Sequence, residues 1–121
     1  MNLQPEFLPV GSIVEYNIGE LATPEWSPTK LDAVDLQWLD GDADEFNRCH
    51  RPIPLTPEIL TEWCGFEKVN STWYRLGNLA INISFDLEWC QNWIGIRLEY
   101  LHQLQHLYSA LTQTVLPITI K

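Results

Sequence analysis

The sequence predicts an α+β protein in which a small N-terminal β-barrel or meander, SH3-like in size, precedes a helix, a three-stranded antiparallel sheet and a C-terminal helix. Three patterns support this prediction. Six of the eight prolines lie in residues 1–56, which favours short strands and loops there. Apolar residues alternate with polar ones between residues 72 and 100, and leucines then recur at helical spacing. We expect residues 1–56 and 57–121 to form one compact unit.

The N-terminal segment holds two predicted strands. Residues 11–17, Gly-Ser-Ile-Val-Glu-Tyr-Asn, have the composition of a strand. After a proline-containing loop, residues 31–39 alternate imperfectly, with apolar side chains at Leu31, Ala33, Val34, Leu36 and Leu39. Short strands joined by turns are typical of small barrels, and the barrel prediction depends on these two strands.

A helix is predicted from Pro57 to Cys64. The hydroxyl group of Thr56 can cap its first turn, and Pro57 suits the first helical position because an N–H there would have no partner within the helix. Gly65 can take the left-handed conformation that ends a helix, with Phe66 packing behind it.

Three strands follow, at residues 72–76, 79–86 and 93–100, with Gly77-Asn78 as a tight turn between the first two. In the second strand, one face carries Leu79, Ile81, Ile83 and Phe85, as a half-buried sheet requires. In the third strand, the same core is joined by Ile94, Ile96, Leu98 and Tyr100. This alternation leaves the reverse face of the sheet to polar and aromatic residues.

The last helix is predicted over residues 101–112. Its apolar side chains gather on one face and are Leu101, Leu104, Leu107, Tyr108 and Leu111. We expect that stripe to pack on the three-stranded sheet. Residues 118–120, Ile-Thr-Ile, are predicted to add a short terminal strand.

Composition and charge exclude several classes of function. The chain carries 16 acidic and 7 basic residues, a net charge of −9, which repels a phosphate backbone and argues against direct nucleic-acid binding. No apolar run has the length of a membrane-spanning helix and no signal segment opens the chain, so we expect a soluble cytoplasmic protein with no membrane partner. Three cysteines at wide spacings indicate reduced thiols rather than disulfides or a zinc site.

Three segments together resemble a known family. They are Pro-Ile-Pro-Leu-Thr at residues 52–56, Cys-Gly-Phe at 64–66 and His-Gln-Leu-Gln-His-Leu-Tyr-Ser-Ala-Leu-Thr at 102–112. Their order and spacing are similar to those of small uncharacterised proteins from Bacteroidetes-type bacteria and their phages and prophages. That family usually has Asn where His106 stands, and Gly followed by an acidic residue after the Leu-Thr that here precedes Gln113. The resemblance implies a setting in mobile elements and no particular chemistry.

Two groups of side chains between residues 40 and 51 suggest metal or catalytic chemistry without meeting its requirements. Asp40, Asp42 and Asp44 are spaced like the first ligands of a calcium loop, but Glu45 replaces the turn glycine and Arg51 the closing glutamate. We therefore expect an exposed acidic turn. Neighbouring residues on an extended chain point apart, so Cys49 and His50 cannot form a nucleophile–base pair. We expect neither a catalytic site nor a cofactor.

Two histidines on the last helix have a metal-ligand spacing. His102 and His106 are four residues apart, yet Gln103 stands where a zinc peptidase has its catalytic glutamate, and a third ligand is missing. We expect both histidines on a solvated or subunit-facing edge of the helix, with no metal bound.

The strongest candidate site is the reverse face of the predicted sheet. Strand alternation groups two tryptophans, two arginines and two small polar residues there: Trp73, Arg75, Asn82, Ser84, Trp93 and Arg97. Indoles offer stacking surface and guanidinium groups bind phosphate or carboxylate, so a small anionic aromatic ligand, such as a nucleotide, would suit this set. Alternatively, the N-terminal segment or a second subunit of a homo-oligomer covers the face, because tryptophan and arginine are also favoured in protein interfaces.

Two main hypotheses of function follow. In the first, the chain is a non-enzymatic binding protein of a phage or mobile element, and this face holds a nucleotide-like ligand or the side chains of a host protein. In the second, the chain inhibits a basic, nucleic-acid-binding host protein through an acidic segment made of Asp32, Asp35, Asp40, Asp42, Asp44 and Glu45. A metal-dependent enzyme built on His102 and His106 is the least favoured hypothesis.

Overall fold

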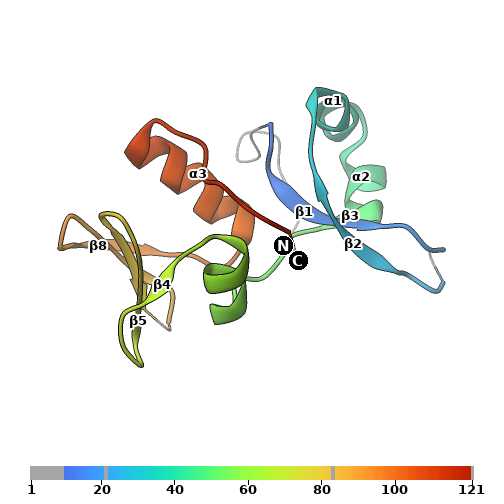
Figure 1. Ribbon diagram of the computed structural model, residues 1–121. Coiled ribbons are helices and arrows are strands. Elements are labelled where there is room, and N and C mark those ends of the chain that lie inside the picture. The colour runs from blue at the N-terminus through green and yellow to red at the C-terminus, as the bar shows by residue number, and fades with distance from the viewer. Residues whose placement is uncertain (1–9, 21, 83, 121) are drawn as a thin grey trace. The chain divides into compact units, whose positions relative to one another are not determined.

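The computed structural model describes residues 10–20, 22–82 and 84–120 and contains both helices and strands, which confirms the predicted α+β class. The chain divides into two compact units. The first comprises the described residues up to Ile53 together with Tyr100–Thr114, and the second comprises Pro54–Glu99 and the residues from Val115 onward. Both units carry a small sheet (Figure 1).

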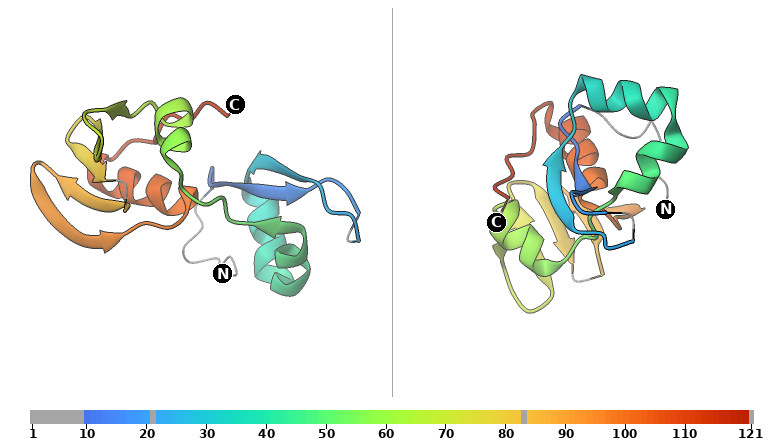
Figure 2. Two further views of the ribbon diagram at one scale, coloured as in Figure 1. Left: turned by 90° about the horizontal axis from the view of Figure 1, so that it is seen from below. Right: turned by 90° about the vertical axis from the view of Figure 1, so that its right-hand side faces the viewer.

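The first unit contains a three-stranded antiparallel sheet in the order β2-β1-β3. The strands are β1 (Ile13–Asn17), β2 (Trp26–Lys30) and β3 (His50–Arg51). Helices α1 (Ala33–Gly41) and α2 (Ala43–Cys49) lie on one side of this sheet in all views (Figures 1 and 2). Their packing buries Val14, Leu31, Leu39 and Phe46 in one cluster. The described strands of this unit form an open sheet, so they do not confirm the predicted barrel.

The strand predicted at residues 31–39 is wrong, because residues 33–41 form helix α1. The side chain of Asp32 accepts a hydrogen bond from the backbone N–H of Asp35 at 2.9 Å, and the side chain of Asp35 accepts from the N–H of Asp32 at 3.0 Å. This reciprocal capping box satisfies two N–H groups at the helix start. Leu36 and Leu39 lie three residues apart, a spacing that suits a helix face as well as an imperfect strand.

Helix α3 (Leu101–Thr112) belongs to the first unit, although the sequence predicted that it packs on the sheet of residues 72–100. The side-chain amide of Gln105 accepts from the N–H of Ile13 at 2.7 Å and donates to the carbonyl group of Gly11 at 2.9 Å. Strand β3 ends before Pro52, which has no N–H to donate. Gln105 therefore completes the hydrogen bonding of β1 beyond the end of β3.

The second unit contains a five-stranded antiparallel sheet in the order β4-β5-β6-β7-β8, seen as one twisted layer in Figure 2. Its strands are β4 (Glu67–Lys68), β5 (Trp73–Leu76), β6 (Leu79–Asn82), β7 (Asp86–Trp89) and β8 (Asn92–Arg97). The predicted turn at Gly77-Asn78 is confirmed, since Leu76 pairs with Leu79 and Gly77 has a φ of 61°. Glycine adopts that φ without steric cost.

The single strand predicted over residues 79–86 is wrong, because a turn divides it into β6 and β7. The side-chain oxygen of Asn82 accepts from the N–H groups of Ser84 at 2.9 Å and Asp86 at 3.1 Å, which stabilises the turn in place of a continued strand. Phe85 has a φ of 61° and so leaves the strand conformation. Ile83 lies outside the described residues. The strand predicted at residues 93–100 is also shorter, since β8 ends at Arg97.

The helix predicted after Thr56 is confirmed, although most of it is a π-helical turn, η2 (Ile59–Trp63). The N–H of Ile59 donates to the hydroxyl oxygen of Thr56 at 3.2 Å, and Gly65 has the expected left-handed φ of 76°. The terminal strand predicted at residues 118–120 does not form, although the N–H of Thr119 donates to the carbonyl group of Trp63 at 2.8 Å. Among the described residues, each helix is too short or too polar to cross a membrane.

Candidate binding face

The strand pairing of the second unit places most of the predicted site residues on one face of its sheet. Directly paired residues of antiparallel strands point to the same side. Trp73 pairs with Asn82, and Arg75 pairs with Ala80. Ala80 pairs with Glu88, which in turn pairs with Trp93. We call this side the open face of the sheet.

Two rows of side chains cross the open face from strand to strand. The first row, from β4 to β8, is Glu67, Arg75, Ala80, Glu88 and Trp93. The second row, from β5 to β8, is Trp73, Asn82, Asp86 and Arg97. Arg97 belongs to it because it pairs with Asp86, across an irregularity that leaves two residues of β8 between Ile94 and Arg97 without a partner.

The two faces of the sheet differ in exposure. On the opposite face Tyr74, Leu79, Ile81 and Leu87 are all buried. On the open face the side chain of Trp93 is 72% exposed, and Arg75 and Arg97 are exposed as well. On the same face Trp73, Asn82, Asp86 and Glu88 are half-buried, and the small side chain of Ala80 at its centre is buried. A large indole facing water is the kind of surface that proteins use for binding.

Of the six residues predicted for the sheet face, Ser84 lies outside the rows, because it belongs to the turn between β6 and β7. Its carbonyl oxygen accepts a hydrogen bond from the Nε of Arg97 at 2.9 Å. The backbone of Ser84 therefore positions the arginine at the edge of the open face, whereas its side chain has no role there that the structure assigns.

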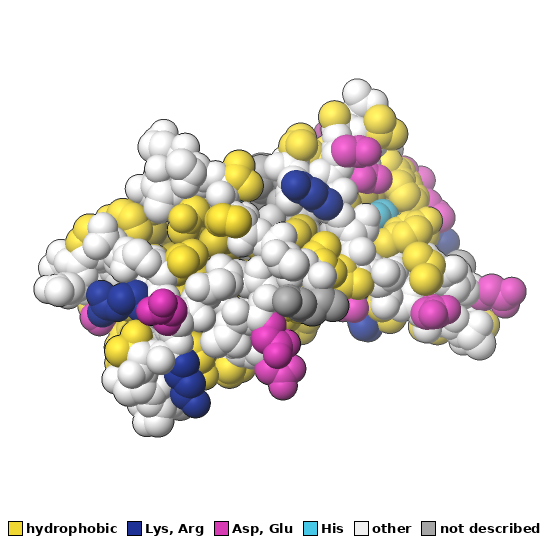
Figure 3. Space-filling view, viewed as in Figure 1, with side chains coloured by type: hydrophobic (Ala, Val, Ile, Leu, Met, Phe, Trp, Pro, Cys, Tyr) yellow, Lys and Arg dark blue, Asp and Glu magenta, His cyan; other side chains and the backbone are white. Residues whose placement is uncertain are grey.

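Acidic residues of the open face were missed by the sequence reasoning. Glu67 lies opposite Arg75, Asp86 lies opposite Arg97, and Glu88 lies between Ala80 and Trp93. Figure 3 shows basic and acidic side chains next to one another on the visible surface of the second unit. The signal for Asp86 and Glu88 was the alternation of residues 86–89, which is detectable only once the turn at Asn82 is recognised. The face thus carries two guanidinium groups and three carboxylates.

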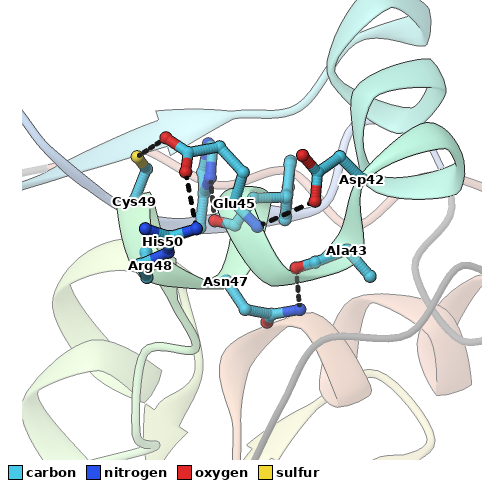
Figure 4. Close-up of polar contacts among 8 residues, drawn as sticks. Asp42, Ala43, Glu45, Asn47, Arg48, Cys49 and His50 are labelled. Carbon is cyan, nitrogen blue, oxygen red and sulfur yellow. Dashed lines mark hydrogen bonds and ion pairs between the residues drawn. The ribbon is translucent and has the colours of Figure 1, made fainter.

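The acidic segment of the second hypothesis is mostly engaged in local structure. Asp32 and Asp35 form the capping box of α1, and the backbone N–H of Asp35 lowers the pKa of Asp32. Asp42 accepts from the N–H of Glu45 at 3.2 Å and so caps α2 (Figure 4). Glu45 pairs with Arg48 at 3.0 Å.

The remaining two acids of that segment, Asp40 and Asp44, are exposed. The exposed acidic turn predicted at residues 40–45 is wrong in part, because α1 ends and α2 begins within it.

Two of the three thiols, those of Cys49 and Cys64, are poorly suited to nucleophilic attack, whereas Cys90 is exposed. Burial, with the Glu45 carboxylate beside it, raises the pKa of Cys49, and burial raises the pKa of Cys64 to about 12. The sulfur of Cys49 lies 3.9 Å from a carboxylate oxygen of Glu45, whereas Nδ1 of His50 lies 2.9 Å from the carbonyl oxygen of Phe46 (Figure 4). Cys49 and His50 therefore contact different partners. The prediction assumed an extended chain at both residues, whereas Cys49 is the last residue of helix α2 and only His50 begins a strand.

The prediction that both histidines of α3 lie on a solvated or subunit-facing edge is wrong for His102, which is buried within the chain itself. Its side chain is 2% exposed, and burial lowers its pKa to about 4. Its ring stacks on Tyr100 with centroids 5.9 Å apart, and its Nδ1 has no hydrogen-bond partner among the described residues. His106 is exposed, so the two rings do not face the same environment. Within the described residues, no cluster of His, Cys, Asp and Glu is arranged to hold a metal ion.

Comparison with known proteins found no relative of this chain. Neither family models, nor curated proteins, nor solved structures gave a match to the chain.

Proposed function

We propose that this chain is a non-catalytic binding protein that holds the side chains of a protein partner on the open face of its five-stranded sheet. The observation that carries the proposal is the 72% exposure of Trp93 on the same face as Arg75 and Arg97. Tryptophan and arginine are the residue types that most often dominate the energy of a protein interface. Covering a large exposed indole also removes apolar surface from water, which is favourable.

The charge pattern favours a protein over a nucleotide as the ligand. Neighbouring strands are about 4.8 Å apart, so an anion bound at either arginine lies within about 5–10 Å of Glu67, Asp86 or Glu88. Those carboxylates repel a phosphate group. A protein surface can offer both signs of charge and apolar contacts, and so complement all members of the two rows.

The environments of Cys49, Cys64 and His102 support binding rather than catalysis. The raised pKa values of Cys49 and Cys64 keep both thiols protonated near neutral pH. His102 is buried and neutral at that pH.

The resemblance to small proteins of bacteria and their phages and prophages leads us to propose that this binding protein acts in a phage or another mobile element.

The alternative function, an acidic inhibitor of a basic host protein, gains less support. Asp32, Asp35, Asp42 and Glu45 are already engaged in capping or ion pairing at the two helices. Helix capping therefore accounts for much of the acidic segment without a partner.

The proposal can be tested by photo-crosslinking in cells that make the protein. A benzophenone amino acid replaces Trp93 in one version and Val34, which is 71% exposed on α1, in the control version. We expect one discrete protein adduct from position 93 that is absent from position 34. Equal or absent crosslinking at both positions would contradict the proposal.

A nucleotide titration tests the competing ligand class. We expect ATP and GTP at millimolar concentration to leave the tryptophan fluorescence unchanged. Saturable quenching that is lost in Arg97→Gln would instead identify the open face as a nucleotide site and overturn the choice of a protein partner.

A further inference from the structure

The two rows of the open face carry their indole and guanidinium groups on opposite strands. In the first row a guanidinium group lies on β5 (Arg75) and an indole lies on β8 (Trp93). In the second row the indole lies on β5 (Trp73) and the guanidinium group on β8 (Arg97). Turning the face over about an axis parallel to the strands therefore exchanges every tryptophan with an arginine of the same row.

From this order we infer that the partner of the open face is a second copy of this chain, packed sheet to sheet about a two-fold axis. The axis runs parallel to the strands, between β6 and β7, so β5 of each copy lies over β8 of the other. Arg75 then meets Trp93 of the second copy, and Trp73 meets Arg97 of the second copy. Two-fold symmetry repeats both contacts, giving four pairings of a guanidinium group with an indole.

The charges and small residues at the centre of the face fit the same arrangement. The axis places β6 over β7, so Glu88 of one copy lies over Ala80 of the other, whose side chain is small. That carboxylate is then about one strand spacing, roughly 5 Å, from Arg75 of the second copy. Asn82 lies over Asp86 of the second copy, where its amide group can donate to the carboxylate. Glu67, on the outermost strand β4, remains at the rim.

Sheet-to-sheet packing also agrees with the dimensions of the face. Packed sheets lie about 10 Å apart with their strands rotated by about 30°, which leaves room for interdigitated indole and guanidinium groups. The four overlapping strands, β5 to β8, extend about 14 Å across the sheet, and four residues extend about 14 Å along it. This area is below that of a standard interface, about 800 Å² per partner, so we expect a weak dimer that dissociates at low micromolar concentration.

Pairing of the two copies through their strand edges is disfavoured by the geometry of β8. The register of β7 and β8 shifts between the pairs Leu87–Ile94 and Asp86–Arg97, and an irregularity of this kind interrupts the regular row of backbone groups that a further strand would need. The face of the sheet, rather than its edge, is the surface on which two copies match.

The test is sedimentation velocity of the full chain at low ionic strength between about 5 and 500 µM. The inference rests on the proposed function, because it names the partner that the open face holds. We expect concentration-dependent dimerisation, and at least a tenfold weaker association in Arg75→Ala and in Trp93→Ala. Val34→Ala, on the other unit, serves as the matched control and should associate like the unmodified chain. Both target side chains are exposed, so the variants should keep the circular dichroism of the parent.

Exchanging the two groups gives the sharper test. Trp93→Arg places Arg75 opposite the new arginine of the second copy and should abolish self-association. Mixing it with the variant Arg75→Trp should restore a dimer, because each interface between unlike copies again pairs one arginine with one tryptophan. A mixture that associates no better than either variant alone would overturn the inference.

The outcomes separate this inference from the proposed function. A chain that stays monomeric at 500 µM, but whose position 93 crosslinks to a different protein, overturns the second copy as partner and leaves the proposed function standing. A monomeric chain with no adduct at position 93 contradicts both. An adduct with twice the mass of the chain, together with a restored mixed dimer, supports both.

Discussion

At the scale of single residues, Gln105 and His102 are the two side chains of α3 whose roles are least visible in the sequence. The amide of Gln105 bonds to the backbone of Ile13 and Gly11, more than 90 positions away. Gln103, two residues earlier, accepts from the N–H of Tyr100 at 3.0 Å and so helps to start the helix. These contacts give a structural reason for the two glutamines of α3.

We predict that Gln105→Leu lowers the free energy of unfolding by about 2–4 kcal/mol. The substitution leaves the N–H of Ile13 and the carbonyl group of Gly11 without their partner, and each buried unsatisfied group costs about 1–3 kcal/mol. Urea denaturation measures the change. The control Gln37→Ala, at an exposed position of α1, should stay within about 0.5 kcal/mol of the parent. Equal effects of the two substitutions would refute the role of Gln105.

The burial of His102 leads us to predict that the stability of the protein depends on pH. Burial lowers its pKa to about 4 from 6.5, so between these values the unfolded chain binds a proton that the folded chain excludes. The free energy of unfolding therefore falls as the pH drops through this window, by roughly 3 kcal/mol in total. Burial also lowers the pKa of His50, which adds a loss of the same sign.

We predict that His102→Phe removes about 2 kcal/mol of the stability loss between pH 7 and pH 5, since Phe keeps the stacked ring but cannot be protonated. Urea midpoints at the two pH values measure it. His106→Gln, at the exposed histidine of the same helix, is the control and should retain the full loss. A parent and a His102→Phe variant with the same pH dependence would show that His102 does not titrate as inferred.

At the scale of elements, the β5–β6 and β7–β8 hairpin turns of the second unit both need a backbone with positive φ, but different residues supply it. Gly77 supplies the positive φ of the β5–β6 turn. The β7–β8 turn has two residues, Cys90 and Gln91, with φ values of 53° and 68°. Positive φ at both positions is the pattern of a type I′ turn, which favours Asn-Gly. A left-handed conformation costs a residue other than glycine roughly 1 kcal/mol.

Replacing that turn by Asn-Gly, in the double substitution Cys90→Asn with Gln91→Gly, should therefore raise the free energy of unfolding by about 1–2 kcal/mol. The bond from the N–H of Cys90 to the carbonyl group of Asn78, at 2.9 Å, involves backbone only and should persist. Thermal and urea unfolding measure the gain. Gly77→Ala is the control, and it should lower the free energy of unfolding instead of raising it. The added methyl group has no atom within contact distance, so the cost should come only from the φ of 61°. No gain from Asn-Gly would mean that the turn relaxes to another conformation.

At the scale of the whole molecule, each strand that ends a sheet carries a feature that limits pairing with another chain. β3 and β4 have two residues each, β2 contains Pro28, and β8 is bulged. Short strands, prolines and bulges all interrupt the row of N–H and carbonyl groups that an incoming strand would need. The longest apolar edge, β8, is the one with the bulge.

Pro28→Val should restore a continuous edge on β2, since valine has an N–H and favours strands. We expect little change in the circular dichroism of the dilute protein and faster formation of thioflavin-positive aggregates at high concentration. Pro24→Val, in the exposed loop before β2, is the matched control. Equal aggregation of both variants would show that Pro28 does not protect the edge.

The sequence by itself determined the features that depend on neighbouring residues: the α+β class, the capped helix start at Thr56, the turn at Gly77-Asn78, and helix α3. Strand alternation also grouped Trp73, Arg75, Asn82, Trp93 and Arg97 correctly, because period-two alternation within a short strand requires only local information. It failed for residues 31–39 and 79–86, where side chains of Asp32 and Asn82 bond to the nearby backbone and favour a helix start and a turn.

Only the tertiary structure decided which segments meet. The attachment of α3 to β1 through Gln105 depends on contacts between residues more than 90 positions apart. The burial of His102 and the pairing that sets carboxylates opposite Arg75 and Arg97 likewise depend on how the elements pack and pair. Local pattern carries no information on such contacts, because the free energy that selects them comes from packing and from hydrogen bonds completed across the fold.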